Sequence, residues 1–194
     1  MTIVGLTGSF CSGKTSCAKI FGKLGATVIN ADDIVHRMYR TDKALKKAIL
    51  RRFGKGVFTP GGNVDRAGLA ARAFGSRNNL NSLQKIVHPK VISEIKKRAL
   101  GSTKPVVIVD AALLLESGLE NFVDYIVVVR ANLDKCVERA SPKGFTRRET
   151  LRRRAMQMPL AQKLRRADFV INNNRSKKDM EKEVRKIWKK LPKE

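Results

Sequence analysis

The sequence predicts a three-layer α/β fold in which about five parallel strands are covered by helices on both faces. The first observation behind this prediction is the N-terminus, where a short apolar strand runs into a glycine-rich turn and then into a helix over residues 13–24. The second is a set of later β-branched runs at 105–110, 124–130 and 167–172, separated by helical patterns. Continuous apolar strands are typical of parallel sheets buried on both faces. A chain of 194 residues is long enough for one domain with insertions.

The glycine-rich turn carries a phosphate-binding motif. Gly8 and Gly13-Lys14-Thr15 have the spacing G-x-x-x-x-G-K-[ST], in which backbone N–H groups surround phosphate oxygens, the lysine reaches the outer phosphates and the hydroxyl holds Mg²⁺. The positive end of the following helix adds to the same anion site. The motif therefore predicts a nucleotide site. The residues expected to line it are Gly8, Ser9, Phe10, Cys11, Ser12, Gly13, Lys14, Thr15 and Ser16.

A second short strand is expected to end at Asn30, and Asp32 and Asp33 follow it at the start of a helical pattern. A carboxylate at the C-terminal end of a strand faces the ligand crevice of an open parallel sheet. Aspartate is also a common helix cap. The pattern therefore predicts one functional carboxylate and one cap, and by itself it leaves open which is which.

From residue 41 to about residue 100 the pattern is helical, with no convincing strand and with a glycine-containing break at 54–62. This stretch predicts a helical insertion between strands. Pro89 favours the first turn of a new helix. His88 stands at that junction, where packing or capping is a more common role than catalysis.

The run 105–110 ends on a carboxylate, Asp110. An acid in this position next to a phosphate loop holds Mg²⁺ directly or through water. The alternative is a buried capping role. The runs 124–130 and 167–172 are expected to be the fourth and fifth strands, and an amphipathic helix is expected over 176–194.

The segment between the last two strands is dense in arginine. So much like charge on a helix repels itself unless anions offset it. In nucleotide kinases such a segment is a lid that closes over the phosphates and supplies guanidinium groups. The arginines concerned are Arg139, Arg147, Arg148, Arg152, Arg153, Arg154, Arg165 and Arg166.

The composition narrows the function classes. A net charge of +24 implies a polyanionic substrate or partner. Aromatic residues are too few and too scattered for an RNA-recognition sheet, so nucleic-acid binding is not expected as the main role. The apolar runs are too short for a bilayer and no signal peptide is recognisable, which predicts a cytoplasmic protein without a membrane segment. Three cysteines without paired spacing argue against a disulfide framework or a zinc site.

Taken together, several stretches resemble the dephospho-coenzyme A kinase family, in family order across nearly the whole chain. The matching stretches are Gly5-Leu-Thr-Gly8 through Gly13-Lys14-Thr15, Val28-Ile-Asn-Ala-Asp32, Asp33-Ile-Val-His36, Val64-Asp-Arg66 with Leu69, Ile86-Val-His88-Pro89, Leu113-Leu-Leu-Glu116-Ser-Gly-Leu, Gln157-Met-Pro159 with Lys163, and Ala167-Asp-Phe-Val-Ile-Asn172 with Asn173. The resemblance implies ATP-dependent phosphorylation of the 3′-hydroxyl of dephospho-CoA, the last step of coenzyme A synthesis.

The resemblance also implies roles for individual residues. Asp32 falls on the acid that lies against the accepting hydroxyl, which makes Asp33 the helix cap. Lys14 and Arg139 join Asp32 as catalytic residues, Thr15 and Asp110 hold Mg²⁺, and Arg153 and Asn172 add to the ATP-binding residues of the loop.

The same resemblance divides the chain into three functional parts. These are a nucleotide-binding core of residues 1–35, 101–139 and 165–194, a helical CoA-binding insertion of residues 36–100, and a lid of residues 140–164. Oligomeric state is not predicted.

The chain departs from the family pattern at several positions. Asn30 replaces an acid near the metal, and Cys11 replaces a glycine that is usual in the loop. Ala112 stands where proline is frequent, and the lid is one residue shorter, with Lys143 where arginine is usual. Two alternatives follow from these departures and from the charge. One is another small-molecule or nucleotide kinase on the same scaffold, and the other is a nucleotide-dependent RNA-binding protein.

Overall fold

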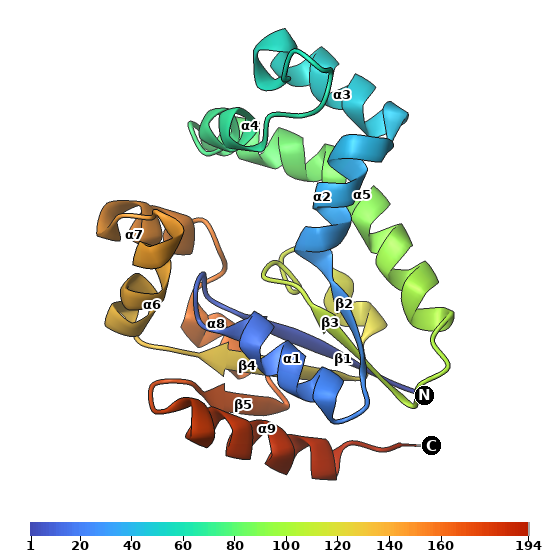
Figure 1. Cartoon of the computed structure of the whole chain (residues 1–194), viewed down its shortest axis with the longest axis vertical. Coiled ribbons are helices and arrows are strands. Elements are labelled where there is room, and N and C mark those ends of the chain that lie inside the picture. The colour runs from blue at the N-terminus through green and yellow to red at the C-terminus, as the bar shows by residue number, and fades with distance from the viewer. Residues whose placement is uncertain (194) are drawn as a thin grey trace. The chain divides into compact units, whose positions relative to one another are not determined.

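A computed structural model describes residues 1–193 and contains one five-stranded parallel sheet (Figure 1). The strand order is β2-β3-β1-β4-β5. The strands are β1 (Thr2–Gly8), β2 (Thr27–Asn30), β3 (Val106–Asp110), β4 (Tyr125–Arg130) and β5 (Phe169–Asn172). The predicted α/β class and the parallel sheet are confirmed. Glu194, which falls within the predicted core and C-terminal helix, lies outside the described residues.

The chain forms two compact units, and the first contains the whole sheet. It consists of Met1–Asn30 and the chain from Arg98 onward. Its helices are α1 (Lys14–Lys23), α6 (Leu133–Ala140), α7 (Arg147–Ala155), α8 (Leu160–Arg165) and α9 (Lys177–Lys190), with short 3₁₀ turns η2 (Leu119–Phe122) and η3 (Ser141–Lys143).

Alternate residues of the central strands bury their side chains against α1 and α9, which cover one face of the sheet (Figure 1). Phe21 of α1 is fully buried in this cluster, and Met180, Val184 and Ile187 enter it from α9. The predicted C-terminal amphipathic helix is therefore confirmed as α9. On the opposite face Leu114 lies so close to Gly5 that any side chain at Gly5 would collide with it.

The strand register brings three strand ends together at the carboxyl edge of the sheet. Asn30 at the end of β2 lies opposite Asp110 at the end of β3, and Leu6 of β1 lies opposite the same Asp110. β1 then continues to Gly8, opposite Val129 of β4. Ligands bind at this edge in open parallel sheets, where the strand order reverses.

The second compact unit, Ala31–Lys97, is helical. It contains α2 (Ala31–Thr41), α3 (Lys43–Phe53), the 3₁₀ turn η1 (Lys55–Val57), α4 (Arg66–Ala73) and most of α5 (Arg77–Leu100). Its own apolar core includes Ile34, Leu45, Ile49, Phe53, Leu69 and Ile95. Apart from one isolated bridge between Phe58 and Val64, the unit contains no strand, as the helical pattern predicted.

The prediction that a new helix begins at Pro89 is wrong, because α5 runs through it. Proline removes the backbone donor that would bond the carbonyl four residues earlier, and its ring crowds that carbonyl. Val87, Val91 and Ile95 on either side of Pro89 are all buried in the structure. Burial of this apolar stripe over several turns outweighs the lost hydrogen bond, so tertiary packing overrides the local signal.

Asp42 joins two helices of the second unit. One carboxylate oxygen accepts a hydrogen bond from the Leu45 backbone N–H at 2.8 Å and caps α3, and the other accepts from Lys90 Nζ of α5 at 2.8 Å. The Lys90 ammonium bonded to Asp42 holds the pKa of that carboxyl below its ordinary value.

We expect Asp42→Ala to lower the free energy of unfolding by about 1 kcal/mol at pH 7, mainly through loss of the cap. A depressed pKa stabilises the fold above the unfolded pKa of 3.8 and the effect is lost as the pH falls through the lower folded pKa. The difference between wild type and Asp42→Ala should therefore shrink at strongly acidic pH. Denaturant unfolding at several pH values tests this, and a difference that grows below pH 3.8 would contradict it.

No helix in the described part of the chain is long and apolar enough to cross a membrane.

Candidate active site

The phosphate loop connects β1 to α1 and is shaped by backbone conformations that favour glycine. Gly13 has φ 97° and stands immediately before α1. A side chain at Gly13 would collide with Asn173, and one at Gly8 would collide with the carbonyl oxygen of Val129. These contacts explain the glycines of the motif in this fold.

Cys11 lies in the same loop and has φ 56°, the one positive φ of a non-glycine residue among residues 1–193. A left-handed conformation costs a residue with a side chain about 1 kcal/mol. The structure therefore gives a reason why glycine is usual at this position, and it shows that the loop keeps its turn with cysteine there.

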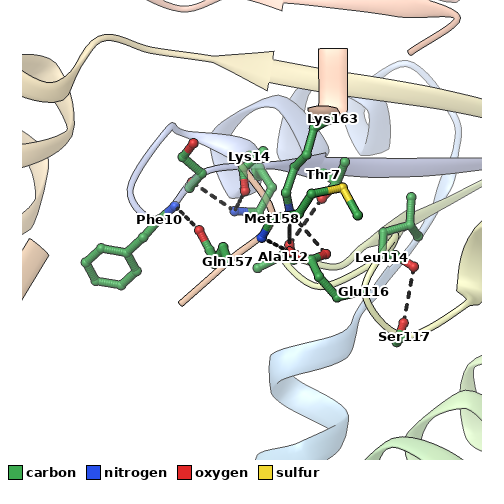
Figure 2. Close-up of polar contacts among 12 residues, drawn as sticks. Thr7, Phe10, Lys14, Ala112, Leu114, Glu116, Ser117, Gln157, Met158 and Lys163 are labelled. Atoms are coloured by element: carbon green, nitrogen blue, oxygen red, sulfur yellow. Dashed lines mark hydrogen bonds and ion pairs between the residues drawn. The ribbon is translucent and has the colours of Figure 1, made fainter. Parts of the chain in front are cut away.

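Lys14 begins α1, and its side chain folds back over the loop. Its Nζ lies 3.4 Å from the carbonyl oxygens of both Gly8 and Ser9 (Figure 2). The Ser12 hydroxyl is buried in the same loop and finds no hydrogen-bond partner among the described residues. A buried polar group without a partner is costly, and a bound phosphate would supply the missing acceptor.

Thr15, Asp110 and Asn30 meet at the carboxyl edge of the sheet. Thr15 Oγ1 donates to Asp110 Oδ2 at 3.2 Å, and Asn30 Nδ2 donates to the same oxygen at 3.4 Å. Asp110 is only 5% exposed. A hydroxyl, a carboxylate and substrate phosphates are the kind of oxygen set that Mg²⁺ takes in phosphate-loop proteins, in which it keeps several waters. The residues present therefore fit the ion, although no group of three or more His, Cys, Asp or Glu side chains suited to a metal occurs in residues 1–193.

Cys17 of α1 is buried close enough to Asp110 to feel its charge. Burial, with a further contribution from Asp110, raises the pKa of the Cys17 thiol to about 12. The thiol stays protonated at neutral pH, so Cys17 is a packing residue of the core.

Arg139, in the last turn of α6, reaches the phosphate loop. Its Nη1 donates to Ser12 O at 3.1 Å, and its Nη2 donates to the backbone oxygen and to Oδ1 of Asn173 at 2.8 and 3.2 Å. Asn173 Nδ2 donates to the same Ser12 carbonyl at 2.8 Å. Arg139 and Asn173 together hold the middle of the loop.

Asn172 ends β5, beside this group. Its Oδ1 accepts a hydrogen bond from Asn174 Nδ2 at 2.7 Å. No local sequence signal marks Asn173 rather than Asn172 as the residue that contacts the loop. Only the register of β5 against β4, which pairs Asn172 with Arg130, decides it.

Arg153 of α7 lies against the tip of the loop. Its guanidinium is 4.4 Å from the ring centroid of Phe145 and 5.4 Å from that of Phe10, and the two rings meet edge to face at 5.2 Å. Burial lowers the pKa of Arg153, but an arginine keeps its charge at neutral pH. The backbone N–H of Phe10 donates to Gln157 Oε1 at 2.8 Å (Figure 2). The arginine-rich segment thus contacts the phosphate loop at Phe10.

Other arginines of this segment have protein partners. Arg147 pairs with Asp134 at 3.1 Å, Arg154 donates to Cys136 Sγ at 3.0 Å, and Arg166 Nη1 donates to both carboxylate oxygens of Glu120. Arg148 and Arg152 are exposed on α7.

Asp32 and Asp33 lie in the first turn of α2, at the start of the second compact unit, and both are exposed. Asp32 follows Asn30 by two residues, so the chain leads to it directly from the strand end that contacts Asp110. Negative side chains in a first helical turn are favoured by the helix dipole.

Comparisons with known proteins show which family the chain is similar to. A model of the family described as dephospho-CoA kinase matches residues 2–179. A dephospho-CoA kinase of Aquifex aeolicus is 35% identical over 98% of both chains, and one of Geobacillus kaustophilus is 36% identical over 96% of this chain and 94% of its own. A crystal structure of a Thermus thermophilus protein, 31% identical, superposes with a TM-score of 0.82 and covers 98% of both chains.

Proposed function

The chain belongs to the dephospho-CoA kinase family, and from this premise we propose that its phosphate loop holds ATP while Asp32 acts on the 3′-hydroxyl of dephospho-CoA. Phosphorylation of that hydroxyl is the final step of coenzyme A synthesis. The observation that supports the donor half most strongly is the convergence of Lys14, Thr15 and Asp110 at one edge of the sheet, around a loop with a buried unpartnered hydroxyl.

On the donor side, Lys14 places an ammonium against the β- and γ-phosphate oxygens. Backbone N–H groups of the loop and the positive end of α1 bind the remaining phosphate charge. Arg139 and Asn173 fix the Ser12 carbonyl, and fixing the carbonyl keeps the neighbouring N–H groups directed into the loop. Asn172 lines the same edge as an ATP-binding residue.

Thr15 and Asp110 would hold Mg²⁺. When bound, the ion neutralises charge on the β- and γ-phosphates and so favours attack by the hydroxyl oxygen. Asn30 offers an amide donor to Asp110 where the family has an acid, which leaves Asp110 as the carboxylate of this group.

On the acceptor side, the Asp32 carboxylate orients the ribose 3′-hydroxyl and takes its proton late in the transfer. We assign binding of the CoA portion to the helical insertion of residues 36–100. The division of the chain into a sheet-containing unit and a compact helical unit of Ala31–Lys97 supports that assignment.

The lid of residues 140–164 excludes water when it closes, and Arg139 and Arg153 supply fixed positive charge to the transferred phosphoryl group. Arg153 lies beside Phe10 in the loop, which supports this role.

We place the protein in the cytoplasm; the free cysteines Cys11, Cys17 and Cys136 agree with a reducing compartment.

The metal assignment predicts that Asp110→Asn loses its response to Mg²⁺. The Mg²⁺ concentration for half-maximal rate should rise at least about tenfold, because one of the anionic ligands becomes neutral. Calorimetry separates this from loss of ATP binding: affinity for ATP in EDTA should stay near that of the wild type. Glu138→Gln on the surface of α6 is the matched control and should behave as wild type. An unchanged Mg²⁺ requirement in Asp110→Asn would refute the assignment.

An acceptor analogue that lacks only the 3′-hydroxyl tests the proposed acceptor atom. We expect the analogue to inhibit competitively against dephospho-CoA and to remain unphosphorylated. Phosphorylation of the analogue would move the acceptor to another hydroxyl. If dephospho-CoA is not a substrate, transfer to other nucleosides would support the alternative kinase, and salt-sensitive retention of RNA would support the RNA-binding alternative.

A further inference from the structure

Lys163 of α8 is a lysine with no exposed side-chain surface, which is rare for this residue type. A buried ammonium is costly unless it is paired and hydrogen-bonded. Burial lowers the pKa of Lys163, and the Glu116 carboxylate that it contacts opposes this shift. Because burying the Lys163 ammonium is costly, stabilisation of the fold alone does not explain why a lysine stands here, beside the phosphate loop.

The first partner of Lys163 is on the sheet side. Its Nζ donates to Ala112 O at 2.7 Å, and the same carbonyl accepts from Thr7 Oγ1 at 3.2 Å (Figure 2). Thr7 immediately precedes Gly8 of the phosphate loop, and Ala112 follows Asp110 by two residues. This carbonyl therefore links the base of the loop to the turn that carries the proposed metal ligand.

The second partner of Lys163 is on the lid side. Its Nζ lies 2.9 Å from Glu116 Oε1, and that oxygen also accepts from the Met158 backbone N–H at 2.7 Å. The residue before Met158 is Gln157, whose side chain accepts from the Phe10 N–H of the loop at 2.8 Å. Figure 2 shows the resulting chain of contacts, which runs from Ala112 through Lys163 and Glu116 to Met158, Gln157 and Phe10.

We propose that Lys163 is a positioning residue for phosphoryl transfer, which fixes the base and the tip of the phosphate loop. It binds the Ala112 carbonyl that Thr7 also contacts at the base, and through Glu116 it holds the Gln157–Met158 segment that contacts Phe10 at the tip. Its ammonium is fully committed to the protein and does not touch ATP. A lysine suits this position because a compact ammonium with several donors can satisfy a carbonyl and a carboxylate at once.

The Lys163–Glu116 pair also contributes no net charge close to the essential ammonium of the loop. The positive charge of Lys14 acts on Lys163. Glu116 offsets this repulsion, so the buried lysine adds no net positive charge beside Lys14.

This inference rests on the proposed function, and the test begins by separating the two. Direct titration of the wild-type protein with Mg-ATP establishes nucleotide binding independently of any acceptor. Lys163→Met should then weaken ATP binding and raise KM for ATP about tenfold, the effect of one lost charge-assisted hydrogen bond. KM for dephospho-CoA should not change. Lys135→Met, which removes an exposed Lys–Glu pair of 2.8 Å, is the matched control and should bind ATP as the wild type does.

Two double variants distinguish positioning from stability. Both double variants, Lys163→Met with Glu116→Gln and Lys163→Met with Glu116→Leu, remove the carboxylate that Lys163→Met alone leaves unpaired, so both should melt at a higher temperature than Lys163→Met. Only glutamine still accepts the Met158 N–H. We expect the glutamine variant to bind ATP several-fold more tightly than the leucine variant, about one hydrogen bond's difference.

Two results would overturn the proposal. One is wild-type ATP affinity in Lys163→Met. The other is an ATP affinity that rises and falls with the melting temperature across the three variants, together with equal ATP affinities for the two double variants. If the wild type itself fails to bind Mg-ATP, the proposed function fails instead.

Discussion

Lys14→Ala should lower kcat/KM for ATP about 10³-fold, the scale of removing one preorganised electrostatic contact from a phosphoryl-transfer site. The reason is geometric. Lys14 Nζ lies 3.4 Å from the loop carbonyls of Gly8 and Ser9, within the turn where the phosphates bind. Alanine keeps the helix start and removes the only part of the residue that reaches the nucleotide. Initial rates of CoA formation measure the effect, and ATP titration should show weaker binding.

Lys19→Ala is the matched control for this change. Lys19 is exposed on the same helix, so the net charge changes equally while the loop is untouched. If Lys14→Ala and Lys19→Ala have equal rates, the assignment of this loop as the site that binds the ATP phosphates is wrong.

The second large effect is expected for Asp32→Asn, which should lower kcat about 10²- to 10⁴-fold, the range for loss of a general base. Affinity for ATP should stay near the wild-type value, because the change affects the acceptor and spares the loop. Asparagine keeps the size and the hydrogen-bonding shape of the side chain but cannot accept the proton.

Asp33→Asn is the comparison that assigns the role. Both carboxylates lie in the first turn of α2 and both are exposed, so exposure and helix-dipole effects are matched. A small effect for Asp33→Asn supports Asp32 as the residue that contacts the hydroxyl. If Asp32→Asn retains near-normal turnover, the role passes to Asp33 or Asp110.

The strands could be predicted from sequence because each is a local apolar run. β3 consists of valine and isoleucine before its final Asp110, and β4 consists of the same two residue types between Tyr125 and Arg130. The order β2-β3-β1-β4-β5 could not be predicted, since it depends on which way each crossover packs. The course of α5 through Pro89 was mispredicted because burial of Val87, Val91 and Ile95 is a tertiary effect.

The site, too, has residues that the sequence predicts and residues that it does not. The spacing of Gly8, Gly13 and Lys14 is a local signal, and it identified a loop whose backbone requires those glycines. Asp110 was expected near the phosphate loop because it is an acid at the end of a buried strand, and in the structure Thr15, 95 residues away, contacts it. The roles of Lys14, Thr15 and Asp110, like those of Asp32, Arg139, Arg153 and Asn172, remain predictions.

Other site residues have contacts that no local signal predicts. Lys163 lies in a stretch that matches the family pattern, but its burial against Glu116, which lies 47 residues earlier, is visible only in the structure. Asn173 contacts Ser12 across 161 residues. The left-handed conformation of Cys11 is likewise visible only in the folded loop. Polar contacts over such separations are decided by how the layers pack.

We propose that this chain transfers the γ-phosphoryl group of ATP, bound at its phosphate loop, to dephospho-CoA. The most direct test incubates the protein with Mg-ATP and dephospho-CoA and follows the acceptor by mass spectrometry. We expect a product heavier by one phosphoryl group, identical to coenzyme A, that forms with the wild type and about 10³-fold more slowly with Lys14→Ala. Product no more abundant than in an enzyme-free control would contradict it.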